Sequence, residues 1–226
     1  MSQIKLIYQP DYMALIPARP CRILSSAVLN GGLTVTASCL NLRVDKYAPP
    51  PWPAPEETLQ QRAAALHLPQ PCTGMMTAAS MKSLAYSHQQ QGQLSAECWV
   101  TAGLSNLRRC GDPGDEAPRA GTINIWLSVS QPLTEAAMAE ALMLLTEAKV
   151  TAIRDAGLCS PVSALPASGT GTDSHAVLCP PPGTQPPLRY CGKHTTAGQL
   201  MGQAVLTATA HSIELCLRAE RLSLPG

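Results

Sequence analysis

The sequence contains no phenylalanine, and aromatic residues make up only 4% of its 226 residues. Because 45% of the residues are hydrophobic, a substantial core is still expected, built from aliphatic side chains, methionine and alanine. The formal net charge is +1, so no excess of one sign marks a nucleic-acid or anionic-membrane surface. No hydrophobic run reaches the roughly 18 residues that a membrane span needs. We therefore expect neither nucleic acid nor membrane insertion among its interactions.

The N-terminal segment also lacks the hydrophobic stretch of a secretory signal, which predicts a cytoplasmic location. The nine cysteines include no C-x-x-C pair, which argues against a zinc knuckle. Four of them, Cys39, Cys98, Cys179 and Cys216, lie in apolar segments. We expect these to be buried small hydrophobic residues. The sequence assigns no metal and no cofactor.

Short β-rich segments dominate the first half of the chain. The predicted strands are 4–8, 14–16, 22–28, 33–44, 75–79, 81–86, 98–104, 123–129 and 176–179. Asn30-Gly31-Gly32, between two of them, favours a hairpin turn. The proline-rich segments 49–55 and 180–187 and the segment 106–120 are expected to be loops.

Three helices are predicted, at 56–66, 135–156 and from 196 to about 217. Thr134 and Gly157 suit the two ends of the second helix. Thr196-Ala197-Gly198-Gln199 is typical of a capping box at the start of the third. Strands early and long helices late predict an α+β fold, in which mostly antiparallel sheets are covered by two long helices. We expect residues 1–226 to form a single domain.

Lys149 interrupts the apolar face of the second helix. On a helical wheel it lies with Met138, Ala141 and Leu145. A lysine in such a face must extend to solvent, pair with a carboxylate or shift its pKa. Asp173 is the proposed buried partner, which would place Lys149 at a functional site.

The segment Ser168-Gly169-Thr170-Gly171-Thr172-Asp173 concentrates small and polar residues before a predicted strand. Gly169 and Gly171 would let the backbone approach a ligand closely. Thr170 and Thr172 supply hydroxyl groups, and Asp173 is a candidate general base. Taken alone, such a string also suits an ordinary turn.

Two residues before the last helix are further candidates. The N-terminus of that helix would favour an anion or oxyanion, and Lys193 and His194 lie beside it. His194 is a candidate general base, or else a polar loop residue. A carboxylate–histidine metal site from Asp173, His175 and His194 is a further alternative that the spacing supports poorly.

Small and amide residues at predicted strand ends form another set. They are Asn30, Gly31, Gly32, Asn106 and Asn124. Structurally these residues suit turns. Their N–H groups and amide side chains could also bind a developing oxyanion or a substrate amide.

Taken in order, eight short motifs resemble the adenosylcobinamide amidohydrolase family (CbiZ). They lie at 25–32, 76–79, 101–106 with 111–113, 121–125, 133–137, 146–149, 169–173, and 192–195 with Gly198. The resemblance covers about residues 21–206. The chain departs from the family pattern at Ser168, at His175, in the segment 195–199 and in the loop 180–187.

The resemblance implies hydrolysis of the aminopropanol amide of adenosylcobinamide, giving adenosylcobyric acid and 1-amino-2-propanol in corrinoid salvage. The corrinoid would be the substrate, with no further cofactor. The candidate catalytic residues are Asp173, Thr172, Thr170, Lys149 and His194, and the candidate substrate-binding residues are Asn30, Gly31, Gly32, Asn106, Asn124, Gly169, Gly171 and Lys193. A water or a threonine hydroxyl would attack, with Asp173 or His194 as base. Met75, Met76 and Trp99 are expected in the wall of the pocket.

Other functions remain open at this point. The same motifs would suit a corrinoid-binding protein without catalysis or an amidase for another substrate. A self-processing hydrolase with a newly freed N-terminal threonine or serine is a third alternative. A homo-oligomer is compatible with the sequence, which does not fix the oligomeric state.

Overall fold

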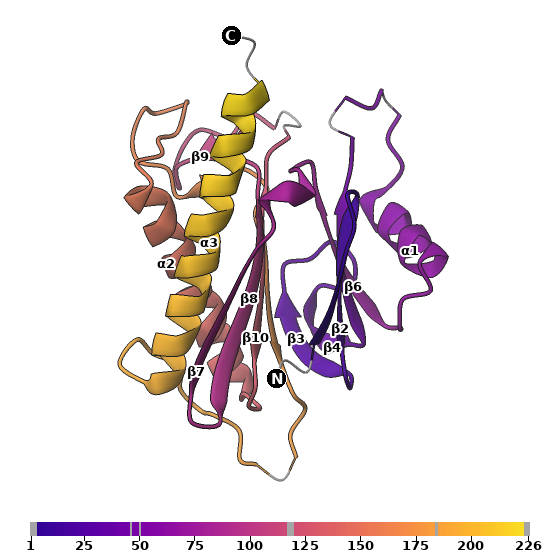
Figure 1. Ribbon diagram of the computed structural model, residues 1–226, viewed down its shortest axis with the longest axis vertical. Coiled ribbons are helices and arrows are strands. Elements are labelled where there is room, and N and C mark those ends of the chain that lie inside the picture. The colour runs from indigo at the N-terminus through magenta and orange to yellow at the C-terminus, as the bar shows by residue number, and fades with distance from the viewer. Residues whose placement is uncertain (1–3, 46, 50, 117–119, 184, 224–226) are drawn as a thin grey trace.

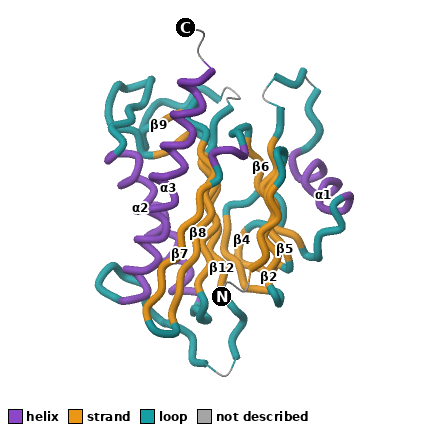
Figure 2. The backbone as a smooth tube through the Cα atoms, viewed as in Figure 1, coloured by secondary structure: helices purple, strands orange, loops and turns teal. Residues whose placement is uncertain are grey.

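Two β-sheets pack face to face between layers of helix (Figures 1 and 2). The computed structural model describes residues 4–45, 47–49, 51–116, 120–183 and 185–223. The helices are α1 (Pro55–Ala65), α2 (Glu135–Asp155) and α3 (Thr196–Ser223), with a short 3₁₀ helix, η1 (Met81–Ser83). The strands are β1 (Ile4–Tyr8), β2 (Tyr12–Pro17), β3 (Cys21–Ser25), β4 (Gly32–Thr36), β5 (Ser38–Arg43), β6 (Cys72–Thr77), β7 (Ala85–Gln91), β8 (Leu94–Ala102), β9 (Leu107–Arg108), β10 (Ile123–Val129), β11 (Gly169–Thr170) and β12 (Ser174–Cys179).

The strand order confirms the expected α+β class. One sheet has the order β1-β2-β5-β6, and the other has the order β4-β3-β12-β10-β8-β7. The pairs β5–β6 and β10–β12 are parallel, and the other named pairs are antiparallel. Helices α2 and α3 cover the outer face of the six-stranded sheet, while α1 covers the four-stranded sheet (Figure 1).

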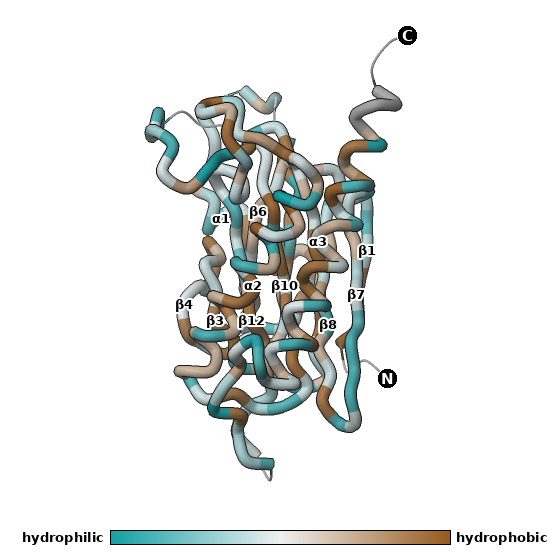
Figure 3. Tube along the Cα trace, turned by 90° about the vertical axis from the view of Figure 1, so that its left-hand side faces the viewer, coloured by the Kyte–Doolittle hydropathy of each residue, from teal (hydrophilic) through white to brown (hydrophobic). Residues whose placement is uncertain are grey.

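Three hydrophobic clusters fill the spaces between the four layers. The largest lies between the six-stranded sheet and helices α2 and α3, and is built from aliphatic side chains, alanine, cysteine and methionine. Trp99 and Trp126 lie in the cluster between the two sheets. Figure 3 shows the consequence for the strands, since central β10 is mainly hydrophobic and edge strand β7 mainly hydrophilic. The four cysteines expected in the core are buried.

The predicted single strand 33–44 is wrong, because the chain changes sheets within it. Strand β4 pairs with β3 in the larger sheet, whereas β5 pairs with β2 and β6 in the smaller. At the corner, Thr36 Oγ1 donates a hydrogen bond to Ser38 O at 2.5 Å. The hydrophobic pattern runs through this corner without interruption, so the sequence pattern did not mark it.

Two other local predictions also differ from the structure. The segment 81–86 is not one strand, because η1 ends at Ser83 and β7 begins at Ala85. The α3 cap is Thr195 rather than Thr196, since Thr195 Oγ1 accepts a hydrogen bond from Gly198 N at 2.9 Å. The predicted caps of α2 are confirmed, with Thr134 Oγ1 accepting from Ala137 N and Gly157 in the left-handed region.

Within the described residues, no helix is long and apolar enough to cross a membrane.

The connection from β10 through α2 to β12 positions the candidate site. Because β10 and β12 are parallel neighbours, their first residues lie side by side, with Asn124 opposite Ser174. Helix α2 packs against β12 and β11. Residues just before the two strands therefore meet at one edge of the sheet, next to the second half of α2.

Candidate active site

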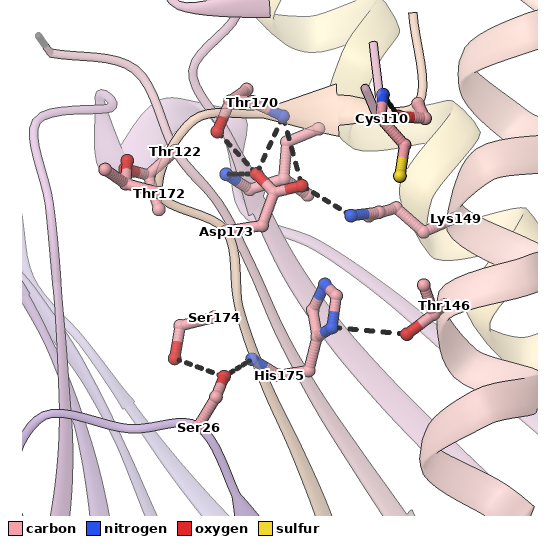
Figure 4. A network of polar contacts seen from close by, with 12 residues as sticks. Ser26, Cys110, Thr122, Thr146, Lys149, Thr170, Thr172, Asp173, Ser174 and His175 are labelled. Carbon is pink, nitrogen blue, oxygen red and sulfur yellow. Dashed lines mark hydrogen bonds and ion pairs between the residues drawn. The ribbon is translucent and has the colours of Figure 1, made fainter. Parts of the chain in front are cut away.

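Asp173 is the most highly connected side chain at this edge (Figure 4). Its Oδ1 accepts hydrogen bonds from Ile123 N at 3.0 Å and from the Thr170 hydroxyl at 2.5 Å. Thr170 N lies 3.1 Å from both carboxylate oxygens. Two backbone groups and a hydroxyl thus donate hydrogen bonds to a carboxylate whose side chain is only 8% exposed.

Lys149 completes this arrangement from α2. Its Nζ lies 2.5 Å from Asp173 Oδ2, and its side chain is 6% exposed. The predicted pairing is confirmed. The charges are compensated in the same buried place, which avoids the large cost of an isolated buried ion.

Gly169 and Gly171 are required by this packing. A Cβ atom at Gly169 would lie 2.2 Å from Asp173 Oδ2 and 2.8 Å from Lys149 Nζ. A Cβ atom at Gly171 would lie 2.7 Å from the Nδ2 of Asn106, whose carbonyl accepts a hydrogen bond from Gly171 N. These glycines therefore serve the close approach of side chains within the protein.

The connections of Asp173 favour a positioning role. Both carboxylate oxygens already accept hydrogen bonds from groups of the protein. Asp173 would therefore have to give up existing hydrogen bonds in order to accept a proton from an attacking group. What Asp173 and Lys149 hold in place is the turn that carries Thr172.

Thr172 faces a cavity of about 540 Å³. The lining is mainly apolar and includes Val28, Val44, Trp52, Pro53, Met75 and Met76. Hydroxyl groups gather at one end, where Thr172 Oγ1 and Thr122 Oγ1 lie 2.7 Å apart and Ser26 Oγ lies 3.3 Å from Ser174 Oγ. Ser26 Oγ also accepts a hydrogen bond from His175 N at 3.0 Å. This is a site that can hold a polar bond beside an apolar body.

His175 is the histidine that lies near Asp173. Its Nδ1 is 3.5 Å from Thr146 Oγ1 on α2, and its Nε2 is buried without a hydrogen-bond partner among the described residues. Burial first, and then the Lys149 cation, lower the pKa of His175 to about 4. His175 is therefore neutral at pH 7.

Lys193 and His194 lie elsewhere. Lys193 forms an ion pair with Glu147, and both side chains are more than half exposed. His194 is exposed beside Gly192, and it does not line the cavity. Within the described ranges, no three or more His, Cys, Asp and Glu side chains form a group suited to a metal ion, so the suggested Asp173–His175–His194 set does not assemble.

Asn30 and Gly31 lie in the connection between β3 and β4, and Gly32 is the first residue of β4; all three lie outside the lining of the cavity. The hairpin connection is the longer segment 26–31, because β3 ends at Ser25 and Ser25 pairs with Gly32; within it Asn30 has φ 53° and its amide donates to Val35 O at 3.3 Å. Asn124 is fully buried and joins the two sheets, donating to Asn41 Oδ1 at 2.8 Å and to Met76 O at 2.9 Å.

The predicted cavity wall is partly right. Met75 and Met76 line the cavity, but Trp99 does not. Trp99 is buried, and its ring centroid lies 5.2 Å from that of Tyr86. The polar and aromatic lining residues that the sequence interpretation missed include Ser26, Asp45, Trp52, Thr122 and Ser174. Ser26 and Thr122 belong to the segments 25–32 and 121–125, which resemble motifs of the family. That resemblance is the feature of the sequence that could have placed them at the site.

Fold and site together define a layered α+β protein with an apolar cavity that ends in hydroxyl groups. The chain belongs to the adenosylcobinamide amidohydrolase family, whose sequence model matches residues 2–221. It is 28% identical over 199 residues to the adenosylcobinamide amidohydrolase of Methanosarcina mazei, covering 84% of this chain and 89% of that protein.

Two further proteins are similar. An uncharacterized protein of Methanocaldococcus jannaschii is 29% identical over 170 residues, which is 66% of this chain and 64% of that protein. The chain therefore spans less than two thirds of the length of that relative. A crystal structure of a Pyrococcus horikoshii protein aligns with a TM-score of 0.48 and 8% identity, over 95% of this chain and 79% of that one.

The buried ion pair predicts strong energetic coupling between Lys149 and Asp173. Asp173→Asn or Lys149→Met alone should lower the free energy of unfolding by about 3–5 kcal/mol, because each leaves one buried charge without its partner. The double variant should lose less stability than the sum of the two single losses, and the difference, which is the coupling energy, should be on the order of 1–3 kcal/mol. Urea unfolding of the four proteins measures this coupling.

The exposed pair Lys193–Glu147 is the matched control. The same cycle with Lys193→Met and Glu147→Gln should give a coupling below about 1 kcal/mol. Equal coupling in the two cycles would contradict the central position given to the buried pair.

The low pKa of His175 predicts a pH dependence of stability. The folded pKa, about 4, lies below the ordinary value of 6.5. The unfolded chain therefore takes up a proton first as the pH falls, and stability is lost from about pH 6.5 downwards. Between pH 7 and pH 5 His175 should account for a loss of about 2 kcal/mol.

His175→Gln removes this titration. Between pH 7 and pH 5 the free energy of unfolding of the variant should therefore fall by about 2 kcal/mol less than that of the wild type. Urea unfolding at several pH values measures the difference between the two proteins, while the other histidines are shared. Parallel pH profiles would show that His175 titrates normally.

Proposed function

We propose that this protein hydrolyses the aminopropanol amide of adenosylcobinamide, releasing adenosylcobyric acid and 1-amino-2-propanol. Membership of the family supports the substrate class. The observation that carries the proposal is the hydroxyl-rich end of the apolar cavity, where Thr172 and Thr122 meet over the buried Lys149–Asp173 pair. A reactive amide could lie against these hydroxyls while an apolar body fills the rest.

The size of the cavity determines how such a substrate would bind. At about 540 Å³ it is in the usual range for a small-molecule site, about 300–1,000 Å³. A corrin ring with its side chains and adenosyl group is larger than this. We therefore assign the cavity to the amide-bearing arm and the adjoining edge of the ring, with the remainder outside.

Amide hydrolysis needs a nucleophile, a proton acceptor and a donor for the leaving amine. In our proposal the Thr172 hydroxyl, or a water held by Thr172 and Thr122, attacks the carbonyl carbon. Thr172 Oγ1 lies 3.1 Å from Gly121 O and 2.7 Å from Thr122 Oγ1, which fix its position. The carbon–nitrogen bond then breaks, and the amine leaves with a proton. If water attacks, the carboxylic acid forms directly, whereas attack by Thr172 leaves an ester that a water molecule then hydrolyses, which releases the acid and restores the hydroxyl.

Asp45 is the group we assign to proton transfer. It lines the same cavity from the segment after β5, and its Oδ1 accepts a hydrogen bond from Tyr47 N at 2.9 Å. Asp173 already holds donors on both oxygens, and His194 does not line the cavity. Asp45 would take the proton of the nucleophile and return it to the nitrogen of the leaving amine.

The first experiment incubates the purified protein with adenosylcobinamide and detects both products by mass spectrometry, with and without EDTA. Thr172→Val should lower kcat by about a hundredfold or more, because it removes the hydroxyl but keeps the shape of the side chain. Thr151→Val is the control, since its hydroxyl donates a hydrogen bond to Glu147 O within α2 and does not line the cavity.

Three results would decide between the functions. Product from the wild type and the control, with little from Thr172→Val, is the expected result. Corrinoid binding without product would favour a non-catalytic binding protein. Full activity of Thr172→Val would contradict the role given to its hydroxyl.

A further inference from the structure

Trp52 is unusual among the tryptophans of this chain. Trp99 and Trp126 are 2% and 0% exposed, whereas Trp52 is 58% exposed. It lines the large cavity, in a sequence without phenylalanine. An exposed tryptophan beside a largely apolar cavity indicates a surface that a ligand covers.

The Trp52 ring is held in place before any ligand arrives. Its Nε1 donates a hydrogen bond to Ala48 O at 2.8 Å. Pro51 and Pro53 flank it, each with φ fixed by its own ring, and α1 begins at Pro55. A preformed aromatic surface loses little entropy when it binds.

The other lining residues limit what can bind against this ring. Near it lie apolar side chains, and the charged residues of the lining are Asp45 and Asp173. Lys149 balances the charge of Asp173. Asp45 therefore gives the cavity a negative character, and an indole face attracts positive charge as well. The cavity suits a flat, apolar ligand that is neutral or cationic.

We propose that the indole face of Trp52 packs against the periphery of the corrin ring and determines how tightly the substrate binds. This inference rests on the proposed function. A cobalt(III) corrin with an adenosyl ligand is a broad, largely apolar ring that carries one positive charge. With the ring against Trp52, its amide arm extends into the same cavity towards the hydroxyls of Thr172 and Ser174.

The test compares Trp52→Ala and Trp52→Phe with the wild type. Calorimetry measures the Kd for adenosylcobinamide and for cyanocobinamide, and steady-state kinetics measures kcat and KM for adenosylcobinamide. Trp52→Ala should raise Kd and KM by roughly 5- to 100-fold, the range found for stacking on aromatic side chains. Trp52→Phe should restore most of the binding, and kcat should change much less than KM.

Tyr190→Ala is the matched control, because Tyr190 is 66% exposed and lies outside the cavity. A second measurement uses the unaltered protein. Acrylamide should shorten the fluorescence lifetime of the exposed Trp52 and leave the two buried tryptophans unaffected. Bound cyanocobinamide should protect Trp52, and a lack of protection would overturn the inference.

The outcomes separate this inference from the proposed function. Hydrolysis by the wild type with unchanged Kd and KM in Trp52→Ala would overturn the role of Trp52 alone. Corrinoid binding that depends on Trp52, without product, would uphold the stacking and reject the hydrolase. No binding of either corrinoid would overturn both.

Discussion

The ion pair between Lys149 and Asp173 is the interaction on which the candidate site depends. It connects the helical layer to the edge of the six-stranded sheet, at 2.5 Å and with both side chains at most 8% exposed. Breaking it would leave a buried charge, which costs several kcal/mol. The turn from Thr170 to Asp173 therefore has one strongly preferred conformation, and that conformation presents Thr172 to the cavity.

Charge compensation on one side of the sheet leaves the other side free for substrate. The helix-facing side holds the ion pair of Lys149 and Asp173, with the neutral His175 beside it. The cavity side holds the hydroxyls and the apolar wall. The buried ion pair and the apolar cavity therefore lie on different sides of the same strands.

The sequence predicted those parts of the site that a periodic pattern reveals. The Lys149–Asp173 pair could be anticipated because helical periodicity reveals a charge on an apolar face. The proline-rich segment carrying Trp52 has no periodicity, and only the packing of α1 on the smaller sheet brings it to the cavity. Which histidine lies near Asp173, His175 or His194, likewise depends on where the start of α3 lies in the fold. Spacing along the chain does not determine that position.

Gly169→Ala, with Gly114→Ala as its control, is the measurement that tests this account most directly. The new methyl group at 169 would meet Asp173 Oδ2 at 2.2 Å, whereas a Cβ at 114 has nothing within 4 Å. Neither substitution removes a functional group. The account predicts that turnover of adenosylcobinamide is lost in Gly169→Ala and kept in Gly114→Ala. Wild-type turnover by Gly169→Ala would show that the site does not depend on the buried pair.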